Sequence, residues 1–198
     1  MLKKTLIAAS LFQAVAFFSQ QFGGMWIPTE INEKEMKSLG MKINATDIWS
    51  TQKPSIKDAV VQFNRGCTGE IISPKGLLLT NHHCGYSAIQ SHSTIDNYLL
   101  SNGFWAKNNK GELTNPGMVV DFVTDIKDIT KEILGNTTGL TDKELNKKIE
   151  ENIDNYRKSQ KLEDYQSILV RPMFAGNKYY AFTVETFKDI RLVGAPLQ

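Results

Sequence analysis

The stretch that decides the fold is GCTGEIISPKGLLLTNHHCGYSAIQ, residues 66–90. It contains both cysteines of the chain, Cys67 and Cys84, and two histidines directly precede the second cysteine. Two short apolar segments flank Ser73-Pro74-Lys75-Gly76, a sequence that suits a type I turn. We therefore expect a β-hairpin in which Cys67 enters one strand and His82-His83-Cys84 leaves the other.

The first 24 residues, MLKKTLIAASLFQAVAFFSQQFGG, have the pattern of a secretory signal peptide. A basic start is followed by an apolar run from Thr5 to Phe18, which is shorter than the roughly 20 residues that span a bilayer. We expect residues 1–19 to be removed and residues 20–198 to form the mature chain, without membrane association. Because exported thiols tend to pair, we also expect Cys67 and Cys84 to form a disulfide bond.

The composition is that of a globular protein, with 41% hydrophobic and 22% charged residues. The formal net charge is only +2, and Lys3 and Lys4 lie in the segment that we expect to be removed. A nearly neutral mature chain argues against a charge-driven nucleic-acid binder. We expect neither a cofactor nor a bound metal ion.

Strand patterns dominate the remainder of the chain. Residues 59–64 and 118–130 are rich in β-branched and alternating apolar residues. Residues 167–175 and 179–187 resemble two strands joined by a turn at Gly176-Asn177-Lys178. The sequence therefore predicts a mainly β fold with some α structure.

Two helical segments are predicted. A short helix should start at Pro28-Thr29 and end at Gly40. In residues 140–160, Thr141 and Glu144 form a capping-box pattern. The apolar positions Leu145, Ile149, Ile153 and Tyr156 share one helical face, so we expect an amphipathic helix inserted between strands and packed on them.

His83 is the candidate general base. In chymotrypsin-like peptidases the general-base histidine directly precedes a cysteine that is disulfide-bonded to the preceding strand. This bond holds the imidazole rigidly while it exchanges protons. On this pattern Cys84 and Cys67 would anchor His83, and His82 would lie on the opposite side of the strand and pack. We expect Ser87 and Ser91 to lie too close in sequence to His83 to act as its nucleophile.

This region has three other interpretations. His82, His83, Cys84 and His92 could bind zinc, but adjacent strand residues would point to opposite faces. Cys84 could be a nucleophile, but export favours its oxidation. Asp121, Asp125 and Asp128 follow His83 at separations that would suit a partner aspartate; we expect Asp121 and Asp125 to share a strand face and all three to be solvated.

Four segments of the sequence together resemble a known family. They are GGMW (23–26), DAVVQFNRGCTGEIISPKGLLLTNHHCGYSAIQ (58–90), NGFWAKNNKGELTNPGMVV (102–120) and ETFKDIRLVGAP (185–196). These segments resemble the dipeptidyl-peptidase 7 and 11 family, family forty-six of the serine peptidases. The resemblance implies a chymotrypsin-like double β-barrel with a helical domain inserted later, and His83 matches the catalytic histidine.

The resemblance also implies a periplasmic or cell-surface exopeptidase that takes oligopeptides, releases dipeptides from their N-termini and forms a homodimer. The family's aspartate lies just beyond the Gly-Ala-Pro motif, and its serine lies much further on. We therefore expect residues 20–198 to be the N-terminal part of the peptidase domain and to be inactive alone. The alternative is a secreted, non-catalytic binding module on a barrel scaffold.

Overall fold

The computed structural model describes residues 26–197, so the predicted signal peptide lies outside the described residues. The chain divides into two compact units, residues 1–42 and 43–198, which are described separately. Within residues 26–197 no helix is both long enough and apolar enough to cross a membrane.

The described part of the first unit contains two short helical segments. A 3₁₀ turn, η1, covers Pro28–Glu30, and helix α2 covers Glu33–Ser38. The prediction of one helix beginning at Pro28 is therefore wrong. The helix restarts because Asn32 caps α2, its side chain accepting a hydrogen bond from the Glu35 backbone N–H at 3.2 Å.

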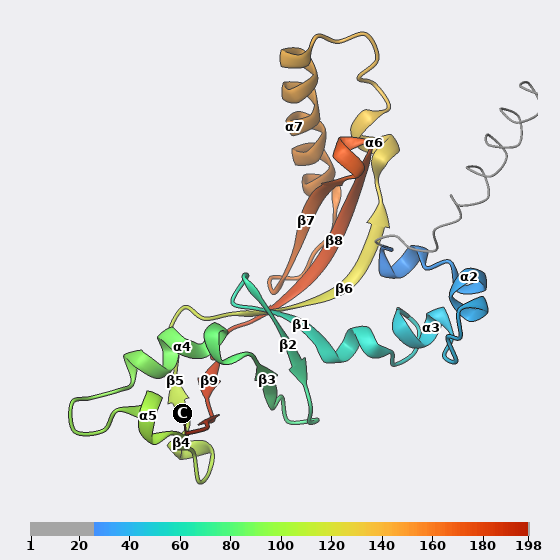
Figure 1. The fold of residues 1–198 in the computed structure, drawn as a ribbon. Helices are drawn as coiled ribbons and strands as arrows, with labels where there is room; N and C mark the ends of the chain where they lie inside the picture. The colour runs from blue at the N-terminus through green and yellow to red at the C-terminus, as the bar shows by residue number, and fades with distance from the viewer. Residues whose placement is uncertain (1–25, 198) are drawn as a thin grey trace, which may run out of the picture. The chain divides into compact units, whose positions relative to one another are not determined.

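The second unit is built on a six-stranded antiparallel sheet with the order β3-β2-β1-β6-β8-β7 (Figure 1). The strands are β1 (Val60–Phe63), β2 (Cys67–Ile71), β3 (Leu78–Thr80), β6 (Val120–Asp128), β7 (Gln166–Met173) and β8 (Lys178–Phe187). The predicted turn between β2 and β3 is confirmed, since the Gly76 N–H donates to the Ser73 carbonyl at 3.1 Å.

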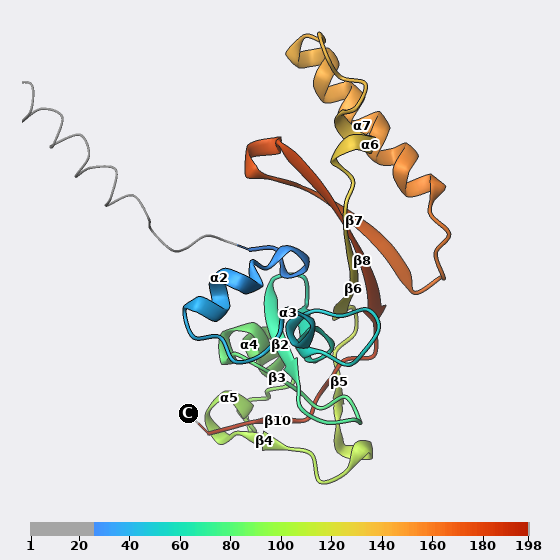
Figure 2. The ribbon, with the colours of Figure 1, turned by 90° about the vertical axis from the view of Figure 1, so that its right-hand side faces the viewer.

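Two small sheets pair strands of the segment 102–120 with strands of the segment 185–196. Strand β4 (Phe104–Trp105) pairs with β10 (Gly194–Ala195), and β5 (Leu113–Thr114) pairs with β9 (Arg191–Leu192). In Figure 2, β4 and β10 lie next to helix α5 (Leu99–Asn102). These residues form a core with Ile89 of helix α4 (His82–Ser91).

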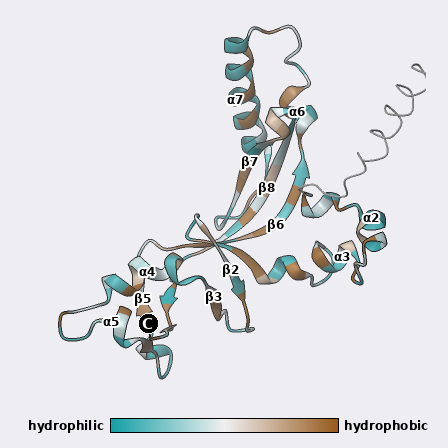
Figure 3. Ribbon diagram, viewed as in Figure 1, coloured by the Kyte–Doolittle hydropathy of each residue, from teal (hydrophilic) through white to brown (hydrophobic). Residues whose placement is uncertain are grey.

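The inserted amphipathic helix is confirmed as α7 (Asp142–Ser159), between β6 and β7. The Thr141 backbone N–H donates to the Glu144 carboxylate at 3.0 Å, and the Thr141 hydroxyl donates to it at 2.6 Å. Figure 3 shows hydrophobic and hydrophilic residues alternating along this helix. Its apolar side packs on a core that includes Ile133 of helix α6 (Thr130–Leu134) and Tyr179 of β8.

The remaining helical segments are short. They are α3 (Ala45–Ile48), η2 (Ile56–Ala59), η3 (Asn109–Gly111) and η4 (Phe174–Gly176). The predicted class, mainly β with some α, is confirmed. In the part of the chain that the structure describes, the six-stranded sheet is open, with β3 and β7 as its edges, and the chymotrypsin-like barrel stays a prediction.

A β-bulge in strand β6 changes the positions of the strand acids. The register with β8 shifts between Val123 and Asp125, so one extra residue, Thr124, reverses the alternation of side chains. Asp121 is only 5% exposed, whereas Asp125 is exposed. The expectations that these two carboxylates share a face and that Asp121 is solvated are therefore wrong.

Candidate functional site

His83 lies in the first turn of α4 and not on a strand. Strand β3 ends at Thr80, Asn81 is the extended N-cap residue, and the Cys84 N–H donates to the Asn81 carbonyl at 3.0 Å. The prediction that His82-His83-Cys84 continues the strand is therefore wrong, because the chain turns into a helix immediately after Asn81.

His82 and His83 have different environments in this turn. The His82 ring makes an edge-to-face contact with Tyr86, four residues later, at a centroid distance of 5.8 Å. His82 thus packs as predicted, but it does so on a residue four positions later in the same helix and not across a strand. His83 is exposed, so its imidazole is accessible to solvent.

The predicted disulfide is present and links the start of β2 to the first turn of α4. Cys67 and Cys84 are bonded, with their Cα atoms 6.2 Å apart, and both side chains pack on the core formed by Val61, Phe63 and Val120. The bond therefore joins the residue next to His83 to both the sheet and this core. An exposed imidazole on such a support can receive and return a proton without a change in the backbone.

The acidic residues weighed as partners for His83 are engaged elsewhere. Asp121 accepts a hydrogen bond from the Thr186 hydroxyl at 2.6 Å. Asp128 accepts from Thr130 and lies 3.4 Å from the Lys178 ammonium, and these contacts lower the pKa of its carboxyl. No hydrogen bond connects His83 to an aspartate or a serine within residues 26–197.

The four residues considered for zinc do not come together. The His92 Nε2 instead lies 3.0 Å from the Asn115 side-chain oxygen. The structure does bring together Cys67, His83 and Cys84, whose possible ligand atoms all lie within 4.8 Å of one another. Both sulfurs are in the disulfide, so the disulfide, and not strand alternation, prevents metal binding in this state.

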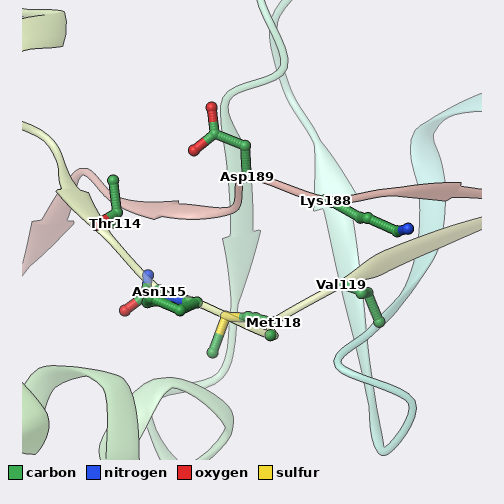
Figure 4. Close-up of a pocket in the computed structure, with 8 residues that line it drawn as sticks. Thr114, Asn115, Met118, Val119, Lys188 and Asp189 are labelled. Atoms are coloured by element: carbon green, nitrogen blue, oxygen red, sulfur yellow. The ribbon is translucent and has the colours of Figure 1, made fainter.

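A cavity of about 420 Å³ was not predicted from the sequence. Figure 4 shows its two sides: Thr114, Asn115, Met118 and Val119 come from one segment, and Lys188 and Asp189 come from another. The segments are about 70 residues apart in sequence, so no local motif could reveal the cavity. The nearest signal was the Asn-Pro-Gly turn at residues 115–117, where Gly117 has a φ of 82°.

The carboxylate that lines this cavity, Asp189, is already paired. Arg191 donates to both carboxylate oxygens of Asp189, at 2.9 and 2.7 Å, and this lowers the pKa of that carboxyl. A neighbouring hollow of about 510 Å³ is lined by Asn64, by the same turn, by residues of α4 including Ser87 and Ser91, and by the C-cap residue His92. Helix α4 therefore carries His83 at its start and lines a hollow with its later turns.

Comparison with known proteins gives consistent results over most of the chain. The family model described as Peptidase S46 matches residues 22–198. An Asp/Glu-specific dipeptidyl-peptidase of Flavobacterium psychrophilum is 52% identical over 180 residues, covering 89% of this chain and 25% of the relative. Dipeptidyl-peptidase 7 of Porphyromonas gingivalis is 37% identical over 199 residues, covering 98% of this chain and 28% of that protein.

Solved structures show the same relationship. The crystal structure of Porphyromonas endodontalis DPP11 in complex with substrate has a TM-score of 0.73 at 38% identity, covering 89% of this chain and 27% of that one. An alternate conformation of the same protein has a TM-score of 0.77. The chain thus spans about a quarter of the length of these relatives. Since the family model covers all the described residues and the fold agrees, the chain belongs to the peptidase S46 family.

Proposed function

We propose that this chain supplies the general base, His83, of an exported serine-type dipeptidyl peptidase that releases dipeptides from the N-termini of oligopeptides. The observation that supports it most directly is the position of His83. Its exposed imidazole lies in the first turn of α4, next to a cysteine that is bonded to the sheet. The relatives that this chain matches at 52% and 37% identity are named dipeptidyl-peptidases.

The imidazole would act in two proton transfers. It takes the proton of a serine hydroxyl as that oxygen attacks the scissile carbonyl, and it returns the proton to the leaving amine. Both steps require the ring to stay within hydrogen-bond distance of successive partners. The Cys67–Cys84 bond and the core beneath it favour this, because they limit movement of the first turn of α4.

The other parts of the mechanism belong to the longer protein that the relatives represent. The resemblance places the serine and the aspartate beyond residue 198. A dimer and a periplasmic or cell-surface location belong to the same proposal. The chain alone, with His83 but without a nucleophile, would not hydrolyse peptides.

The test is a substitution of His83 in the full-length protein, assayed by release of dipeptides from oligopeptides. His83→Ala should lower kcat by roughly a millionfold, as loss of a triad histidine does. The matched control is His82→Ala, one residue away in the same turn, which should retain activity within about tenfold because it leaves the triad intact. Equal activities of His83→Ala and the unaltered protein would refute the role of His83.

A binding module without catalysis is the alternative function. It would be favoured if the unaltered full-length protein released no dipeptides and did not react with a serine-directed fluorophosphonate. Reaction with this reagent in the His82→Ala variant but not in the His83→Ala variant would support the peptidase, because the reagent requires an activated serine.

A further inference from the structure

Cys67, His83 and Cys84 form a group of three potential metal ligands that the disulfide keeps from binding. Their ligand atoms lie within 4.8 Å of one another. In a tetrahedral zinc site, bond lengths of about 2.3 Å to sulfur and 2.0 Å to nitrogen place the ligand atoms about 3.5 to 3.8 Å apart. The His83 ring therefore already lies close to this spacing from both sulfurs, while the two sulfurs, which are bonded to each other, must separate to reach it.

We propose that reduction of the Cys67–Cys84 bond creates a site for a zinc-like divalent ion with the ligand set Cys67, Cys84 and His83. Two thiolates and one imidazole are ligands that zinc prefers, and the fourth position would be filled by water. The Cα atoms of the two cysteines are 6.2 Å apart, so the sulfurs can separate by side-chain rotation while the backbone remains in place.

The reduction step needs an external two-electron reductant, such as a phosphine or a dithiol. With a phosphine, the sulfur–sulfur bond breaks, water supplies the oxygen of the phosphine oxide, and two thiols form. Metal binding then releases the two thiol protons. The resulting site is only half-buried, because His83 is exposed while both cysteines are partly covered. An ion could therefore enter without opening of the core.

Binding of the ion would have a consequence for the proposed base. A ring nitrogen of His83 that holds a metal ion cannot take a proton from a serine hydroxyl. This consequence, unlike the metal site itself, depends on the proposed function. The disulfide would then have two roles: it supports the turn that carries His83, and it prevents the neighbouring sulfurs from recruiting that histidine as a ligand.

The site can be tested with Co²⁺, whose spectrum reports both tetrahedral geometry and sulfur ligation. The full-length protein is reduced with a phosphine, desalted without oxygen and titrated with Co²⁺. We expect one ion per chain, with a thiolate charge-transfer band, in the reduced protein, and no such band in the oxidised protein. The Cys67→Ser/Cys84→Ser double variant should lack the band in both states.

The contribution of His83 is measured by His83→Gln, which should weaken Co²⁺ binding by at least about tenfold. His92→Gln is the control and should bind as the unaltered protein does, because His92 faces Asn115 instead. Equal binding by His83→Gln and the unaltered protein would overturn the site. So would an absent charge-transfer band after reduction, or loss of the helical circular dichroism signal, because the ligand set requires a folded α4.

These readouts separate the two proposals. An oxidised protein that releases dipeptides while its reduced form fails to bind Co²⁺ would support the peptidase and refute the metal site. A reduced protein that binds one Co²⁺ through His83, with no peptidase activity when oxidised, would support the site and refute the proposed function.

Discussion

The indole ring of Trp105 lies directly against the Cα atom of Gly194. The two residues face each other in the pairing of β4 with β10, and a β-carbon at position 194 would lie 2.5 Å from Cε3 and from Cζ3 of the ring. This contact explains the glycine of the Gly-Ala-Pro segment, since any side chain there would displace the indole. Glycine is therefore needed here for the close approach of the indole and not for its backbone conformation, because the φ of Gly194 is not positive.

Gly194→Ala should move the Trp105 indole and destabilise the β4–β10 pair. We expect a loss of up to about 1 kcal/mol in the free energy of unfolding, because the added methyl group breaks a cross-strand contact but the indole, which is 71% exposed, can move into solvent. Urea denaturation measures the loss, and tryptophan emission reports the movement; Trp105→Phe should abolish the emission change. Gly111→Ala is the control, since its nearest neighbours lie 3.9 Å away. Equal stabilities of Gly194→Ala and Gly111→Ala would contradict this explanation.

Asn152 should be the most sensitive polar residue of α7. It is buried, and its side-chain amide donates to the Ile133 carbonyl at 2.8 Å and to the Asn136 side-chain oxygen at 2.9 Å. Asn152→Ala leaves a buried carbonyl without a donor and should cost about 1 to 3 kcal/mol. The exposed Asn155 of the same helix provides the control, and Asn155→Ala should change stability by less than about 0.5 kcal/mol. Thermal unfolding that ranks the two variants equally would be inconsistent with the bonds.

The hydrogen bond from Thr186 to buried Asp121 should contribute more than a neutral hydrogen bond in the same strand pair. Thr186→Val removes the donor and should cost about 1 to 3 kcal/mol, because a buried carboxylate loses a partner. The comparison is Thr124→Val, which removes a hydroxyl that donates to the Thr183 carbonyl at 3.2 Å and should cost about 1 kcal/mol. A larger loss for Thr124→Val in chemical denaturation would reverse this ranking.

The capping box of α7 should make helix stability depend on pH. Hydrogen bonds from the Thr141 hydroxyl and backbone lower the pKa of the Glu144 carboxyl below its ordinary value of 4.5. A lowered pKa means that the stabilising contribution is present above the ordinary value and is lost as the pH falls through the lowered one. In Thr141→Ala the Glu144 pKa should rise toward 4.5, as measured by NMR titration of the carboxyl carbon. An unchanged titration curve would show that the Thr141 hydroxyl does not act on this group.

The sequence was most informative where the structure depends on local signals. The Ser73–Gly76 turn and the Thr141 capping box each need only four residues, and both are present. The start of α4 was missed although Asn81 is a favoured N-cap residue, because the apolar strand before it gave the stronger pattern. The bulge at Thr124 also leaves no mark in the sequence, since it depends on the register with β8.

The candidate site was predictable in its residues but not in its geometry. Cys67, His83 and Cys84 could be selected from spacing and from a family resemblance. The helical turn at the start of α4 places His83 and Cys84 beside Cys67, and this brings their three side-chain ligand atoms close together. The cavity beside Asn115 and Asp189 needed the tertiary fold, because its two walls come from distant segments.

The paired strands β6 and β8 connect two separate hydrophobic cores. Strand β6 contributes Val120 to the core that supports the disulfide, and strand β8 contributes Tyr179 to the core beneath α6 and α7, which also contains Ile129 just after β6. Separate cores allow separate opening reactions, so amide hydrogens of α7 can exchange through a local event that leaves the hairpin of Cys67 folded. The end of the sheet that carries α7 can therefore loosen and refold without disturbing the turn that carries His83.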